Sequence, residues 1–272
     1  MRKSFQKYLP ACFYGSLLLV TAFGCHADFS SRNSEVISGM SAGKWQDLAE
    51  ESEPSLRPLK ITDIQSCINM LDVNTRNKPA HPTNYGERLQ VTAEGRKLPA
   101  NPSLIVLHET VLDAQETIRL FQENHPNDRD QVSYHKLIES DGTQTTLVED
   151  SKRAYGAGMS HYGGYTLRST KKSPGSINNI ALHVSLESPR AQDSDSRHEG
   201  YSIPQYKSLA ATVLVWQMLF GIPMANVTTD AAVGRSHSRY DPRGFRRDIF
   251  DLYHSDYAYK CGVHIYAFDA SA

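Results

Sequence analysis

The chain has 272 residues, of which 39% are hydrophobic and 22% are charged, and its formal net charge is −1. This length and apolar content suit one medium-sized domain with a buried core and additional terminal segments. The near-neutral charge leaves no strong basic field, which argues against nucleic acid as a partner.

The first 25 residues have the features of an export signal. Arg2, Lys3 and Lys7 are followed by an apolar stretch at residues 11–23, and the segment contains no acidic residue. The stretch is too short to span a membrane and has the length of a signal-peptide core. Removing these three bases from the 29 of the chain leaves 26 against 30 acids, a formal net charge of −4.

The end of this leader favours a lipid anchor. The sequence Ala-Phe-Gly-Cys that ends at Cys25 is similar to a bacterial lipobox, in which the cysteine is acylated and becomes the new N-terminus. The alternative is soluble secretion after Ala27, at a site similar to Ala-x-Ala. We therefore expect an exported, periplasmic protein, anchored to the outer membrane as a lipoprotein if Cys25 is acylated.

Cys67 and Cys261 are the cysteines that remain once the leader is set aside. Two thiols in an oxidising compartment usually pair, so we expect a disulfide that ties the start of the domain to its end. The alternative is two buried free thiols.

The rest of the chain divides into a tether and a domain. Residues 26–57 are rich in Ser, Glu, Asp and Gly and have little apolar periodicity, which predicts a polar tether. In residues 58–272, apolar runs alternate with helical patterns from Ile61 onward. This alternation predicts an α/β fold, a mixed central β-sheet flanked by α-helices.

The sequence predicts a strand at residues 104–107 and a helix at residues 114–124. Residues 104–107 form an apolar run after an Asn-Pro pair and predict a buried strand. Residues 114–124 have apolar residues at helical spacing, and Asp113 is the expected N-cap.

Four further segments predict strands. Residues 132–138 and 145–148 are joined across an Asp-Gly pair at 141–142, a signal for a hairpin turn. Residues 177–186 alternate enough for another central strand, and residues 226–228 predict a short one.

Residues 203–220 form the longest predicted helix. Ser202 is its expected N-cap, and Pro204 suits the first turn. Its apolar stripe predicts a face packed in the core and not a ligand platform. The stripe consists of Tyr206, Leu209, Val213, Trp216 and Phe220.

His108 follows the first buried strand directly, and polar groups at strand ends line the ligand sites of α/β proteins. A second polar group, Asp230, His237 and Asp241, lies in and beside a loop at residues 235–245. A histidine from a strand with a histidine or carboxylate from a distant loop gives three ligands and leaves zinc a position for water. Zinc in such a site supports amide hydrolysis.

Five motifs follow one another between residues 100 and 250. They are Leu-Ile-Val-Leu-His-Glu-Thr at 104–110, Val-Ser-Tyr-His at 132–135 with Asp-Gly at 141–142, Ala-Tyr-Gly-Ala-Gly-Met-Ser at 154–160, Asn-Ile-Ala-Leu-His at 179–183, and Arg-Tyr-Asp-Pro at 239–242. Together they resemble the zinc-dependent N-acetylmuramoyl-L-alanine amidases, which share the fold of peptidoglycan recognition proteins. The resemblance implies that fold, Zn²⁺ as cofactor, and peptidoglycan or muropeptides as substrate.

The resemblance also implies roles for individual residues. His108 matches the first zinc ligand, and Asp241 matches the last one. Arg239 matches a lysine that steadies the oxyanion, a task that a guanidinium can also perform. Tyr155 and Gly158 match a segment of the substrate groove.

Two positions depart from the family pattern. Asp230 stands where the family has its second zinc histidine, and two carboxylates make a more anionic ligand set and a weaker Lewis acid. His237 is the alternative ligand. His183 stands where many members have a catalytic glutamate, and we expect it to carry the proton.

His135 is expected to shape the substrate pocket, with a structural hydrogen bond as the alternative. The expected function is hydrolysis of the amide bond between N-acetylmuramic acid and the L-alanine of the stem peptide. The alternative is a catalytically weak or inactive peptidoglycan-binding module of the same fold, marked by Asp230 and His183.

Overall fold

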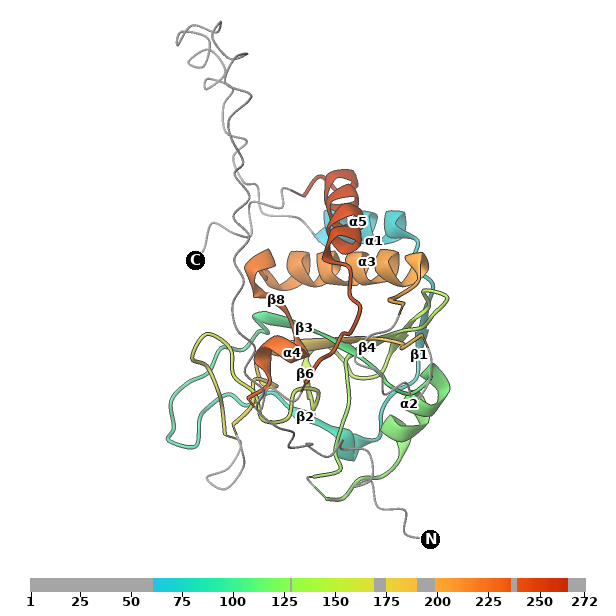
Figure 1. The fold of residues 1–272 in the computed structure, drawn as a ribbon. Helices are drawn as coiled ribbons and strands as arrows, with labels where there is room; N and C mark the ends of the chain where they lie inside the picture. Colours follow the sequence, from blue (N-terminus) through green and yellow to red (C-terminus); the bar gives the residue numbers. More distant parts are fainter. Residues whose placement is uncertain (1–60, 128, 169–174, 190–198, 236–238, 264–272) are drawn as a thin grey trace, which may run out of the picture. The chain divides into compact units, whose positions relative to one another are not determined.

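The computed structural model describes residues 61–127, 129–168, 175–189, 199–235 and 239–263 (Figure 1). The chain divides into two units, Met1–Ser55 and Leu56–Ala272, and every described residue belongs to the second. The predicted leader with Cys25, the tether at 26–57 and His237 lie outside the described residues. None of the described helices has both the length and the apolar character needed to span a membrane.

A six-stranded mixed sheet forms the centre of the domain, in the order β1-β5-β4-β7-β3-β8. Its strands are β1 (Thr75–Asn77), β3 (Leu104–Glu109), β4 (Lys136–Ile138), β5 (Gln144–Thr146), β7 (Ala181–Leu186) and β8 (Val227–Thr229). The four strands β4, β7, β3 and β8 run parallel, whereas β5 is antiparallel to β4. A separate pair joins β2 (Tyr85–Glu87) to β6 (Lys152–Ala154). The predicted α/β fold with a mixed sheet is confirmed.

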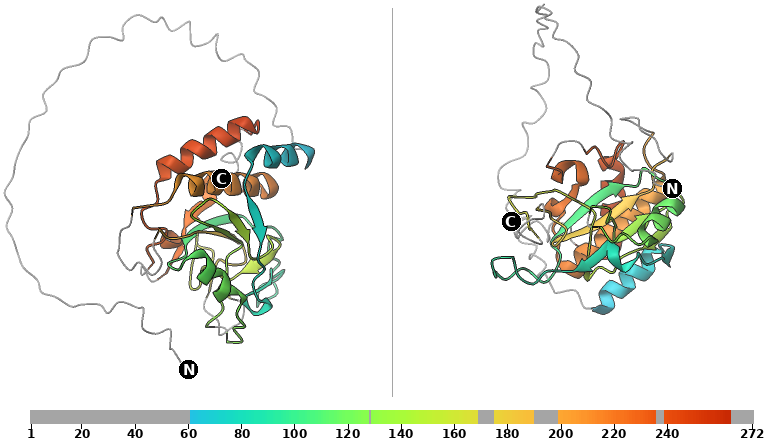
Figure 2. Two further views of the ribbon diagram at one scale, coloured as in Figure 1. Left: turned by 90° about the vertical axis from the view of Figure 1, so that its right-hand side faces the viewer. Right: turned by 90° about the horizontal axis from the view of Figure 1, so that it is seen from below.

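Helices cover both faces of this sheet. The helix α3 (Ile203–Phe220) lies along one face, with α1 (Ile61–Leu71) and α5 (Arg247–Lys260) packed outside it, and α2 (Ala114–Gln122) lies on the other side (Figures 1 and 2). Because both faces are covered, every residue of β3 and β7 is buried. This double burial explains why these strands read as nearly continuous apolar runs.

The helix α3 has the predicted bounds because its ends carry strong signals. The side chain of Ser202 accepts a hydrogen bond from Gln205 N, and the side chain of Gln205 accepts one from Ser202 N. Gly221 ends the helix with φ at 67°, a left-handed conformation that favours glycine. The predicted stripe lies in the core, with Phe220 partly buried against the other residues.

The strand ends differ from their predicted positions. The predicted strand at 177–186 begins only at Ala181, because residues 177–180 form a turn in which Ile180 N donates to Ile177 O. The predicted strand at 132–138 is shorter in the structure, where it is β4 at 136–138. The strand predicted at 145–148 is β5 at 144–146, and the one predicted at 226–228 is β8 at 227–229.

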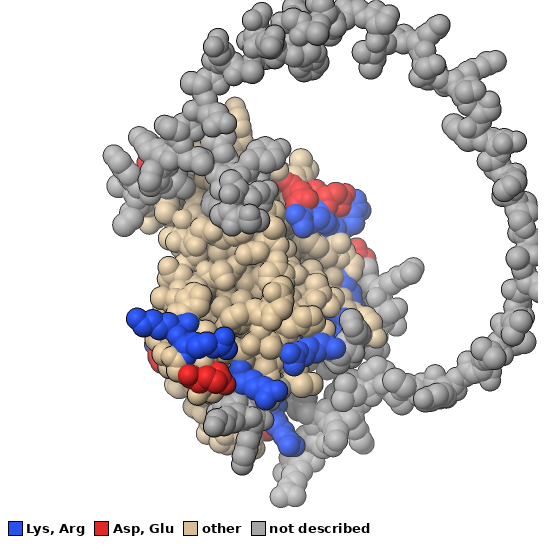
Figure 3. Space-filling view, turned by 90° about the vertical axis from the view of Figure 1, so that its left-hand side faces the viewer, with Lys and Arg blue, Asp and Glu red and all other residues tan. Residues whose placement is uncertain are grey.

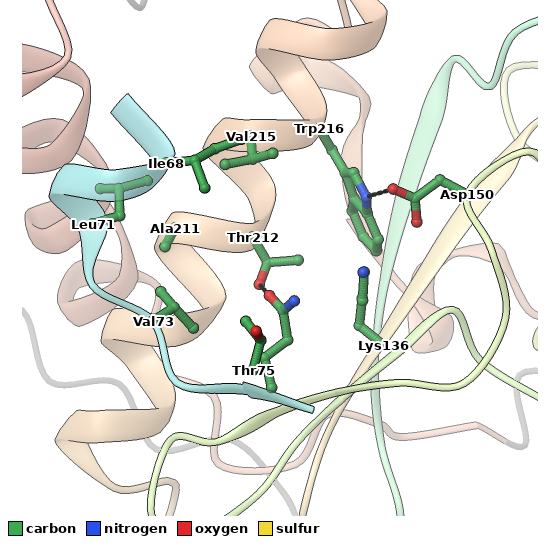
Figure 4. Close-up of a pocket in the computed structure, with 11 residues that line it drawn as sticks. Ile68, Leu71, Val73, Thr75, Lys136, Asp150, Ala211, Thr212, Val215 and Trp216 are labelled. Atoms are coloured by element: carbon green, nitrogen blue, oxygen red, sulfur yellow. Dashed lines mark hydrogen bonds between the residues drawn. The ribbon is translucent and has the colours of Figure 1, made fainter. Parts of the chain in front are cut away.

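A disulfide joins Cys67 to Cys261, with Cα atoms 5.1 Å apart, and so connects α1 to the end of α5. A cavity of about 220 Å³ lies between α1, α3 and the sheet edge near β1 and β5 (Figure 4). Two hydrogen bonds span this region: Trp216 Nε1 donates to Asp150 Oδ2 at 2.9 Å, and Thr212 Oγ1 donates to Gln144 Oε1 at 2.6 Å. These bonds tie α3 to β5 and to the segment between β5 and β6, beside the cavity.

One side of the molecule is shown in Figure 3. Lys and Arg side chains lie mainly along the lower part of this face, and uncharged surface fills its middle. In the upper part, basic and acidic side chains lie next to one another. Charge on this face is therefore dispersed and partly paired.

Candidate metal centre and active site

Three side chains with metal-ligand chemistry meet near the C-terminal ends of β3 and β8. His108 Nδ1 is 3.8 Å from Asp230 Oδ1 and 3.5 Å from Asp241 Oδ2. One ligand atom from each residue lies within 4.8 Å of the other two. Ligand atoms at about 2.0–2.1 Å from a tetrahedral zinc ion are about 3.3–3.4 Å apart, so small adjustments would let this group hold zinc.

Neighbouring elements bring these residues together. His108 lies within β3, whereas the sequence predicted the strand to end before it. Asp230 follows β8 and opens the short helix α4 (Asp230–Val233), whose N-cap is Thr229. The carbonyl of Asp241 accepts a hydrogen bond from Ala231 N at 3.0 Å, which holds the Asp241 loop against α4.

A buried ion pair anchors the same loop to β3. The carboxylate of Glu109 accepts hydrogen bonds from Arg243 Nε and from the Tyr201 hydroxyl, the latter at 2.8 Å. The backbone N–H of Glu109 donates to Asp241 Oδ2 at 3.4 Å. Since a buried charge requires a partner, this pair fixes the loop that carries Asp241.

We expect Glu109→Gln to lower the free energy of unfolding by about 3 kcal/mol, because it removes the negative charge from the buried ion pair with the Arg243 guanidinium. Denaturant unfolding followed by circular dichroism measures this loss. The matched control is Glu87→Gln, since the Glu87 side chain is 78% exposed in its pair with Lys152 and should contribute little. Equal losses in the two variants would contradict the prediction.

His183 lies behind His108 and does not reach an open surface. Its Nδ1 is 2.9 Å from His108 Nε2, and the residue is 0% exposed. Burial and then the neighbouring His108 lower the pKa of His183, so its ring is neutral. The residue opposite His108 in the strand register is Ser185. This burial and the contact with His108 favour a supporting role behind the ligand over the predicted role of His183 as the catalytic proton carrier.

His135 is also buried, and its contacts are internal. Its Nδ1 accepts from His183 N at 2.9 Å, and its Nε2 lies 3.2 Å from Lys152 O. Burial, and next the charge of Arg88, lower the pKa of His135 to about 3. These contacts support the structural alternative over the predicted substrate-binding role.

Arg239 lies beside the metal-ligand group. Its Nη1 donates to Asp230 Oδ1 at 2.5 Å, and its side chain is 26% exposed. Gly158 has φ at +43°, and a Cβ there would lie 2.6 Å from Arg239 Nη2. The structure thus places the predicted oxyanion residue at the site, with Gly158 providing room for it.

The other predicted groove residues have different surroundings. A Cβ on Gly156 would lie 2.7 Å from the ring of His183, so this glycine permits close packing on that ring. The Tyr155 side chain extends toward Gly86, while its backbone N–H donates to Ser133 Oγ at 3.1 Å. The described contacts do not bring Tyr155 to the metal-ligand group.

Tyr134 is a site residue that sequence analysis did not single out. Its ring stacks on His108, with centroids 4.6 Å apart and planes at 27°. Burial, and then the negative charges of Asp241 and Asp230, raise the pKa of Tyr134, so its hydroxyl stays protonated and can donate a hydrogen bond. In the sequence, only the position of Tyr134 within the motif at 132–135 indicated that it could belong to the site.

The chain is similar to solved structures of other proteins. A selenomethionine derivative of AmpD is 23% identical, with 66% of this chain and 94% of that chain covered and a TM-score of 0.50. The E. coli amidase AmiD, in complex with anhydro-N-acetylmuramic acid-L-Ala-D-γ-Glu-L-Lys, is 18% identical, with 64% of this chain and 65% of that chain covered and a TM-score of 0.44. No curated protein sequence matches this chain.

The family comparison covers the site itself. Residues 98–244 match the protein family described as N-acetylmuramoyl-L-alanine amidase. This span includes more than half of the chain, and it contains β3, β7, β8 and the three residues of the metal-ligand group. The chain therefore belongs to the N-acetylmuramoyl-L-alanine amidase family.

Proposed function

We propose that this peptidoglycan amidase uses zinc, held by His108 Nδ1, Asp230 and Asp241, to hydrolyse the bond between N-acetylmuramic acid and L-alanine. The convergence of these three ligand atoms within 4.8 Å supports the proposal. Imidazole and carboxylate groups are both accepted zinc ligands. Bound zinc would polarise the amide carbonyl and lower the pKa of water.

Two further side chains suit the charge that develops during amide hydrolysis. Arg239 presents a guanidinium beside Asp230 and can stabilise an oxyanion. Tyr134 stacks on His108 and keeps its hydroxyl proton, so it can donate a hydrogen bond to the reacting carbonyl. We assign both residues to stabilisation of the transition state.

Metal content and a muropeptide digest test this function together. The purified full chain should contain zinc and release stem peptides from muropeptides. Release should stop when a chelator removes the metal, and it should return when zinc is added. Peptidoglycan binding without zinc and without release would favour the alternative of a binding module.

We expect Asp230→His to increase amidase activity several-fold. The neutral imidazole neutralises less of the charge of the ion than a carboxylate does, which leaves a stronger Lewis acid. Asp248→His is the control, because Asp248 lies on α5, with a side chain 64% exposed. Initial rates of stem-peptide release at saturating zinc measure the effect. A loss of activity in Asp230→His would show that the site depends on its second carboxylate.

We also propose that the protein is exported to the periplasm and anchored through acylated Cys25, as its leader sequence suggests. Cys25→Ser should move the protein from the membrane fraction to the soluble fraction. Cys12→Ser, in the same leader, should leave it with the membrane. Wild-type protein in the soluble fraction would leave secretion as the remaining alternative.

A further inference from the structure

We propose that His183 is a positioning residue, which orients His108 toward the metal ion by accepting a hydrogen bond from His108 Nε2. The inference rests on the proposed zinc site and deepens it. It assigns His183 to the support of a ligand and not to contact with substrate.

The two ring nitrogens of His108 face different partners. Its Nδ1 faces the carboxylates of Asp230 and Asp241, at 3.8 and 3.5 Å. Its Nε2 is 2.9 Å from His183 Nδ1. A neutral imidazole carries one proton, and the nitrogen that binds a metal must offer its lone pair. His108 can therefore bind the ion through Nδ1 only when its proton is on Nε2, where it points at His183.

His183 is free to take the complementary tautomer. To accept from His108, it must keep the lone pair on Nδ1 and carry its own proton on Nε2. His183 Nε2 is buried and has no hydrogen-bond partner among the described residues. No second contact at that atom competes to set the tautomer, so the proton position in His183 can follow that of His108.

The surrounding packing fixes where this acceptor lies. His183 N donates to His135 Nδ1 at 2.9 Å, and the two rings stack with centroids 5.8 Å apart and planes at 12°. On another side, a Cβ on Gly156 would approach the His183 ring to 2.7 Å, so glycine is needed there. A rigid acceptor holds the His108 ring in one orientation, and such support typically changes metal affinity by about 10–100-fold.

Two variants of similar shape separate the hydrogen bond from the packing. His183→Asn and His183→Leu both remove the ring, but the Asn side-chain oxygen can occupy the place of Nδ1 and accept the hydrogen bond. We expect His183→Leu to weaken zinc affinity by about 10–100-fold, and His183→Asn to stay much closer to wild type. Competition with a chromophoric zinc chelator, on the full chain, measures the dissociation constants.

The outcomes distinguish this inference from the proposed function. Equal weakening in both variants would show a packing role only, and unchanged affinity in both would show no role, so either result overturns the inference. If wild type binds no zinc, the proposed zinc site fails and the inference fails with it. If the variants do not fold, a measurement on the wild-type protein still tests the inference. In the zinc-loaded protein, ¹⁵N NMR should show His108 Nε2 protonated and His183 Nδ1 unprotonated, and a proton on His183 Nδ1 would also overturn the inference.

Discussion

His108→Ala should remove zinc from the protein and lower amidase turnover by at least about a thousandfold. A metal ion contributes several kcal/mol of charge stabilisation in a transition state, and 4 kcal/mol corresponds to about 10³ in rate. His108 is the single imidazole in a group whose other members are carboxylates. Its loss leaves two oxygen ligands, which do not make a tight zinc site.

The control for this variant is another histidine at a distance from the metal-ligand group. His81 caps a short 3₁₀ turn, and its Nδ1 lies 2.9 Å from Thr83 Oγ1. His81→Ala should retain zinc and turnover, with at most a modest loss of stability. Zinc content by elemental analysis and the rate of stem-peptide release are measured on both variants. Full zinc occupancy in His108→Ala would mean that the ion binds elsewhere.

The helices show why only part of the fold could be predicted. The bounds of α3 were predicted correctly because a capping residue, a proline in the first turn and an apolar stripe agree. The helix α5 was missed because its buried face consists of Phe250, His254 and Ala258, among many charged residues. Only one of these three has a large apolar side chain, so the periodic signal is weak. Its burial is decided by packing against α3, which the local sequence does not encode.

The site was predicted to a similar extent, and for a similar reason. His108, Asp230 and Asp241 could be selected because each has ligand chemistry and lies at or beside a strand or loop that the motifs mark. The position of His183 could not be predicted, because it depends on the register between two strands far apart in the chain. In the structure, Ser185 pairs with His108. His183 lies two residues earlier in β7, on the same face of the sheet, and pairs with Val106.

The disulfide between Cys67 and Cys261 should contribute strongly to the stability of the domain. It closes a loop with a sequence separation of 194. In the chain-entropy account, a cross-link over such a loop stabilises the folded state by about 5 kcal/mol, because it restricts the unfolded chain. For a domain of this size, the loss corresponds to a melting temperature lower by about 10–20 °C.

Alanine is the appropriate replacement, because Cys67 is 2% exposed and packs in an apolar cluster with Leu71, Ala211 and Leu214. A serine hydroxyl at this position would be buried in an apolar cluster. The cost of its desolvation would add to the loss of stability caused by removing the disulfide. Calorimetry of Cys67→Ala, of Cys261→Ala and of reduced wild type should give similar melting temperatures, all below that of oxidised wild type. Peptide mapping without reductant should recover the two cysteines in one linked fragment. If the fragment is absent and reductant does not change the melting temperature, the thiols are free and α1 is held on α3 and α5 by packing alone.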